Sequence, residues 1–114
     1  MDSLDQDVLD RLGRDMGGPG AVVRVIAMYL GKLPAESALL HQSADAGDLG
    51  ALGEDAHRLK SSTAMLGATG LAGLLAELEA AAKAEDATSV SRLLSAFDAE
   101  KSRVESEMRS LESG

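Results

Sequence analysis

The residues best suited to chemistry lie in one segment, where a histidine and a lysine share a helix face with small side chains. If residues 48–66 form a helix with about 100° per residue, this face is centred about 120° from the apolar stripe. It consists of Gly50, Gly53, His57, Lys60, Ser61 and Ala64. Each glycine costs a helix about 1 kcal/mol relative to alanine, so such a face is unusual for a helix that only meets water. The face leaves the imidazole accessible, which predicts that a partner docks at His57.

The chemistry available to His57 is nucleophilic. A neutral imidazole can attack an activated phosphoryl group and form a phosphoramidate. Lys60, one turn further along, can bring its ammonium near the phosphoryl oxygens and offset their charge. The chain has no glycine-rich phosphate loop of the G-x-x-x-x-G-K-[ST] type. We therefore expect no cofactor of its own, and a phosphoryl donor that brings its own activation and magnesium.

A metal site is the alternative chemistry for this segment. Glu54 and His57 have the Glu-x-x-His spacing that ligates di-iron centres in helical bundles. Such a centre needs a second copy of that spacing, but Ala38 stands three residues before His41. We therefore expect no metal, and we expect His41 to be structural or exposed.

Five segments of helical periodicity position these residues, and no segment alternates as a half-buried strand would. The expected helices span residues 4–16, 20–46, 48–66, 69–84 and 88–111. We expect all of residues 1–114 to form one domain, an all-α antiparallel up-down four-helix bundle with a short extra N-terminal helix.

Several residues predict where these helices begin and end. Ser3 and Gln6 resemble a capping box for the first helix, and Pro34 predicts a kink or a break in the second. Asp48 and Thr69 are the expected N-caps of the third and fourth helices. Gly67 is the expected left-handed residue after the third.

The segment from His57 to Ala68 closely resembles the signature of histidine-containing phosphotransfer (HPt) domains. It reads His57-Arg58-Leu59-Lys60-Ser61-Ser62, followed by Thr63-Ala64-Met65-Leu66-Gly67-Ala68. The surrounding residues fit the same family, namely Ala46-Gly47-Asp48, Leu52 and Ala56 upstream and Leu71, Leu78 and Glu79 downstream. The resemblance covers essentially the whole chain.

The resemblance implies that His57 accepts a phosphoryl group from a receiver-domain aspartate and passes it to another receiver, with Lys60 assisting phosphoryl binding. Ser61 stands where the family most often has glycine, and its hydroxyl can hydrogen-bond the imidazole or the phosphoryl group. Gly53, Ala64 and Met65 are the expected docking residues, although Met65 can equally be rim packing. The implied partners are response-regulator receivers and a hybrid histidine kinase, and the implied protein is a phosphocarrier without ATP-dependent kinase activity.

The composition limits the other function classes. The formal net charge is −8 and aromatic residues make up 2% of the chain, which argues against nucleic acid or an anionic membrane as a partner. There are no cysteines, and the acidic amino end lacks the pattern of a signal peptide. We expect a cytoplasmic monomer. Two alternatives stay open, namely a non-catalytic helical module that binds or sequesters receivers, and a phosphotransfer domain detached from a hybrid kinase.

Overall fold

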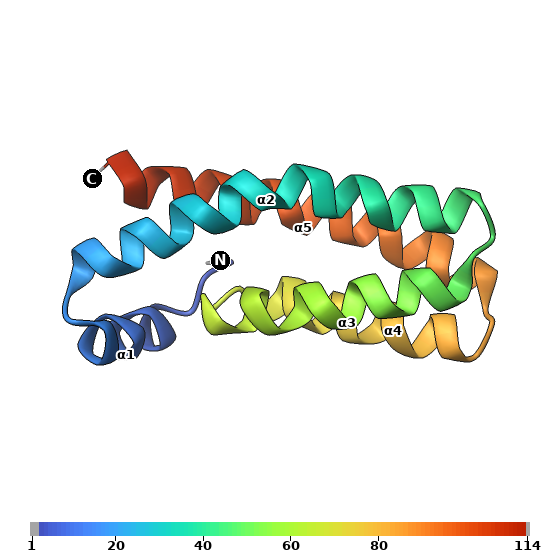
Figure 1. The fold of residues 1–114 in the computed structure, drawn as a ribbon, viewed down its shortest axis with the longest axis horizontal. Coiled ribbons are helices and arrows are strands. Elements are labelled where there is room, and N and C mark those ends of the chain that lie inside the picture. Colours follow the sequence, from blue (N-terminus) through green and yellow to red (C-terminus); the bar gives the residue numbers. More distant parts are fainter. Residues whose placement is uncertain (1–2, 114) are drawn as a thin grey trace.

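The computed structural model describes residues 3–113, and these residues form five helices (Figure 1). The helices are α1 (Gln6–Met16), α2 (Pro19–Asp45), α3 (Leu49–Met65), α4 (Thr69–Lys83) and α5 (Ala87–Ser113). The described residues contain no strand, which confirms the all-helical prediction. None of these helices is both long enough and apolar enough to cross a membrane.

The four longer helices pack around a common apolar core. α3 packs against α2 and α4, and α5 packs against the same two helices from the other side (Figure 1). Their facing stripes are fully buried, and full burial of each large apolar side chain contributes about 1.5–3 kcal/mol. The largest of these side chains are Ile26, Leu33, Leu40, Leu52, Leu66, Leu71, Leu75, Leu78, Phe97 and Met108.

The helix that carries His57 is fixed at both ends by local chemistry. The Asp48 carboxylate accepts a hydrogen bond from the Ala51 amide at 3.1 Å, as expected of an N-cap. At the other end Gly67 has a φ of 78°, in the left-handed region that glycine adopts without strain. Both sequence expectations for α3 are confirmed.

The short helix α1 is attached where α3 turns into α4 (Figure 1). The Asp5 amide donates to the Gly67 carbonyl at 2.7 Å. A Cβ atom at Gly67 would lie only 2.8 Å from the Asp5 carbonyl oxygen. Gly67 is therefore required twice, once for its φ and once for this close approach.

Two expected helix caps are wrong, because other residues occupy the N-cap positions of α1 and α4. α1 is capped by Asp5, whose Oδ1 accepts from the Asp7 amide at 3.0 Å, while the Ser3 amide donates to Glu107 on α5. Thr69 does not cap α4. The residue before the helix is Ala68, which is buried and donates its amide to the Thr63 carbonyl at 3.2 Å.

α2 is continuous from Pro19 to Asp45, so a break at Pro34 is wrong. Proline removes one helical hydrogen bond. Pro34 lies on the exposed face, where water can reach the backbone, while Leu33 and Leu40 hold the two halves of the helix in the core.

Candidate functional site

His57 lies on the outer face of α3, with its side chain 66% exposed. Its neighbours Ala56 and Leu59 point inward and are buried. On the same face as His57 the small residues Gly50, Ser61 and Ala64 are exposed. No large side chain of α3 therefore covers the imidazole on this face.

Glu79 of α4 links His57 to two lysines. Its Oε2 atom lies 3.0 Å from His57 Nδ1, and its Oε1 atom accepts a hydrogen bond from Lys60 Nζ at 2.9 Å. Lys83, one turn further along α4, places its Nζ 3.3 Å from the same Oε2 atom. The Glu79 side chain is only 13% exposed. These four side chains form one cluster across α3 and α4, which we call the His57 cluster.

The cluster fixes which nitrogen of His57 is available. The hydrogen bond from Lys60 lowers the pKa of Glu79 to about 2, and Lys83 and His57 act in the same direction against partial desolvation. Glu79 is therefore ionised at neutral pH and can only accept hydrogen bonds. Nδ1 of His57 must then carry the proton of this contact, and in the neutral imidazole Nε2 keeps its free lone pair.

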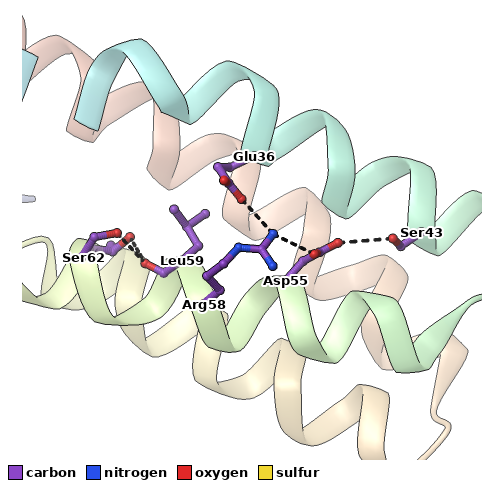
Figure 2. A network of polar contacts seen from close by, with 7 residues as sticks. Glu36, Ser43, Asp55, Arg58, Leu59 and Ser62 are labelled. Carbon is purple, nitrogen blue, oxygen red and sulfur yellow. Dashed lines mark hydrogen bonds and ion pairs between the residues drawn. The ribbon is translucent and has the colours of Figure 1, made fainter. Parts of the chain in front are cut away.

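Arg58, the residue after His57, holds α3 against α2 (Figure 2). Its Nη2 atom donates to Asp55 on the same helix at 2.9 Å and to Glu36 on α2 at 3.4 Å. Ser43 of α2 donates to the other oxygen of Asp55 at 3.4 Å. These hydrogen bonds raise the pKa of Arg58, Asp55 first and Glu36 second. These contacts connect α3 to α2 next to His57, whereas the buried stripe of Leu52, Ala56 and Leu59 fixes which face of α3 is turned outward.

A groove of about 330 Å³ lies beside His57 on the side of α4. Its lining combines small and apolar residues with charged ones, namely Leu49, Gly50, Gly53, Glu54, His57, Glu79, Ala82 and Lys83. A Cβ atom at Gly53 would lie 3.4 Å from the Ala82 Cβ atom, an ordinary contact distance. Gly50 and Gly53 contribute no side chain to this groove.

Met65 lies on the opposite side, at a second hollow between α2 and α3. Met65 is 48% exposed as a residue, and Met28 of α2, beside the same hollow, is 64% exposed. Ser61 also lines this hollow, whereas Gly53 lines the groove toward α4. Of the three expected docking residues, Gly53 and Met65 therefore line different hollows on the two sides of α3, and Ala64 is exposed but lines neither.

Glu79 belongs to the family pattern in the sequence, but nothing in the sequence indicates a role for it or for Lys83. The available signal is the i,i+4 spacing of Glu79 and Lys83, which is common on solvated helices and points to no particular site. Only the packing of α3 on α4 brings this pair to His57.

The other histidine makes a separate contact. His41 Nε2 lies 2.9 Å from Oδ1 of Asp98, which joins α2 to α5. Glu54, the other half of the Glu-x-x-His spacing, lines the groove beside His57. Within residues 3–113 no group of three or more histidine, aspartate or glutamate side chains is arranged to hold a metal ion.

The chain is similar to known proteins in both sequence family and fold. The family model of the Hpt domain matches residues 24–112. Among solved structures, the chain is similar to histidine-containing phosphotransfer protein B (HptB) from Pseudomonas aeruginosa PAO1, at 26% sequence identity and a TM-score of 0.89. That match covers 96% of this chain and 94% of HptB. No curated protein sequence matches.

The two matches support a role in histidine phosphotransfer within two-component phosphorelay signalling. The matched family segment contains His57, Lys60, Glu79 and Lys83. The match to HptB extends over nearly the full length of both chains. The chain belongs to the Hpt domain family.

Proposed function

We propose that this protein is a phosphorelay intermediate that accepts a phosphoryl group on Nε2 of His57 and passes it to a second receiver domain. The observation that carries the proposal is the contact of 3.0 Å between His57 Nδ1 and the ionised Glu79 carboxylate, on an imidazole that is 66% exposed. The contact orients the ring and leaves the nucleophilic nitrogen accessible.

In the forward step, the Nε2 lone pair attacks the phosphorus atom of a receiver's aspartyl phosphate. The N–P bond forms, the P–O bond to the aspartate breaks, and the aspartate leaves as a carboxylate. The receiver supplies the Mg²⁺ that offsets the charge on the phosphoryl oxygens. In the onward step, the aspartate of a second receiver attacks the same phosphorus atom, and the N–P bond breaks.

Glu79 acts as a positioning residue in this scheme. When Nε2 binds phosphorus, the ring becomes positively charged and keeps its Nδ1 proton. The Glu79 carboxylate stabilises that charge, as a carboxylate does for an imidazolium. Lys60 lies on the other carboxylate oxygen, 2.9 Å away, and is 32% exposed, from where it can turn toward the phosphoryl oxygens. Ser61, one turn after His57, provides access and a hydroxyl.

The partners we propose are response-regulator receivers and a hybrid histidine kinase, which dock over α3. Gly53, Ala64 and Met65 form the contact surface, because a receiver must bring its aspartate to Nε2 of a ring that lies between them. We further propose that α2 to α5 form an antiparallel up-down bundle with α1 as an addition. The protein is then a cytoplasmic, monomeric phosphocarrier without ATP-dependent kinase activity.

The test is transfer from a receiver phosphorylated with ³²P. We expect label on the protein that is acid-labile and base-stable, as expected for phosphohistidine. The label should be lost in His57→Gln and kept in the matched control His41→Gln. Label that persists in His57→Gln, or wild-type protein that takes no label from the receivers of its own organism, would refute the proposal. Binding of receivers without any label would support the sequestering alternative.

A further inference from the structure

Lys83 is a second cation close to His57, in addition to Lys60. Lys83 Nζ and His57 Nδ1 contact the same oxygen of Glu79, at 3.3 and 3.0 Å. They therefore lie within two hydrogen-bond lengths of each other. Lys60, in contrast, is bound to the other oxygen of that carboxylate.

Lys83 also borders the open space next to the ring. The groove beside His57 is lined by Lys83 and Glu79 but not by Lys60. The side chain of Lys83 is 74% exposed, against 32% for Lys60. An i,i+4 ion pair with an exposed lysine contributes little free energy. Lys83 can therefore leave Glu79 for an anion that carries more negative charge, at a small cost in free energy.

The charges of the groove favour such a cation once His57 is phosphorylated. A phosphoryl group brings between one and two negative charges and three acceptor oxygens. Glu79 and Glu54 line the same groove and repel it. Lys83 is the cation of this lining, and its flexible stem extends from the last turn of α4.

We infer that Lys83 leaves Glu79 when His57 is phosphorylated and binds the phosphoryl group from the α4 side of the groove. The inference rests on the proposed function. It gives the phosphoryl group a second cation, because Lys83 approaches it from α4 while Lys60 approaches it from α3. In the unphosphorylated His57 cluster, the Glu79 carboxylate thus keeps Lys83 close to the nucleophilic imidazole.

The first experiment measures how label distributes at equilibrium between the protein and a phosphorylated receiver. We expect Lys83→Met to shift this distribution roughly threefold to tenfold toward the receiver, the range for loss of one partly exposed charge-assisted contact. Lys83→Arg should stay near the wild type. Lys101→Met is the matched control, since Lys101 forms an i,i+4 pair with Glu105 on α5, and it should cause no shift.

The sign of the shift separates this inference from a simpler one. If Lys83 only competes with His57 for Glu79, its removal strengthens the Glu79 contact and shifts the label toward the protein. That result, or an unchanged distribution in Lys83→Met, would overturn the inference while the proposed function stands. Wild-type protein that takes no label would overturn both.

A second measurement does not depend on receiver docking. The protein is phosphorylated with phosphoramidate as the donor, and the lysine ammonium groups are followed by NMR. We expect the Lys83 Nζ resonance to shift on phosphorylation, with slower proton exchange, while that of Lys101 stays unchanged. A Lys83 resonance that does not respond in a protein whose His57 is phosphorylated contradicts the inference.

Discussion

Gly53 offers a test of the argument that the small residues of α3 serve access and not stability. It lies in the interior of α3, where glycine costs about 1 kcal/mol relative to alanine. A Cβ atom at this position would lie 3.4 Å from the Ala82 Cβ atom, so a methyl group fits without moving α4. We therefore expect Gly53→Ala to raise the free energy of unfolding by about 0.5–1 kcal/mol, or the melting temperature by about 4 °C.

The same methyl group should impair phosphotransfer. Gly53 lines the groove beside His57, and an added methyl narrows the space that the phosphoryl group and the receiver backbone must share. We expect the rate of transfer from a phosphorylated receiver to fall roughly threefold to tenfold, since displacements well below 1 Å already slow an in-line reaction.

Urea denaturation followed by circular dichroism gives the stability, and quenched transfer assays give the rate. Gly73→Ala is the matched control, because Gly73 lies within α4 with open space around it. The control should gain similar stability at an unchanged rate. If Gly53→Ala is more stable and transfers like the wild type, the small residues are not required for docking. If it is less stable, the added methyl group does not fit beside Ala82.

Three further predictions concern the residues that hold the site in place. The hydrogen bond from Lys60 is the main cause that lowers the pKa of Glu79 from its ordinary 4.5 to about 2 in the folded protein. Ionised Glu79 therefore stabilises the folded state above pH 4.5, and this contribution is lost as the pH falls toward 2. The difference in unfolding free energy between the wild type and Glu79→Gln should shrink over that range, and a difference independent of pH would contradict the assignment. Tyr29→Phe should lower the free energy of unfolding by about 1 kcal/mol, because the buried hydroxyl forms a hydrogen bond with Thr63 Oγ1 at 2.6 Å. Burial raises the pKa of Tyr29 from 10.0 to about 12, so the wild type should lose stability between those pH values in alkaline denaturation, and an equal loss in the variant would refute this. Gly67→Ala should lower the free energy of unfolding by about 1–3 kcal/mol. The φ of residue 67 is 78°, and a Cβ atom there would lie 2.8 Å from the Asp5 carbonyl oxygen. Faster amide exchange in α1 should accompany that loss, and a variant as stable as the wild type would exclude this role for Gly67.

The features that the sequence predicted well are local. The Asp48 cap and the left-handed Gly67 each depend on residues within one helical turn, so spacing alone identifies them. The caps expected at Ser3 and Thr69 failed for the opposite reason. The Ser3 amide bonds to Glu107, more than a hundred residues away, and Ala68 is buried in the turn between α3 and α4.

By itself, the sequence determined that the chain is helical and that one face of α3 presents a histidine among small residues, because helical period and residue type are written in consecutive positions. Only the tertiary structure decided the surroundings of that histidine. Glu79 is 22 positions from His57, and the packing of α3 on α4 brings its carboxylate to Nδ1. That contact orients the ring, and the same carboxylate gathers Lys60 and Lys83, because opposite charges are drawn together in a site partly shielded from water.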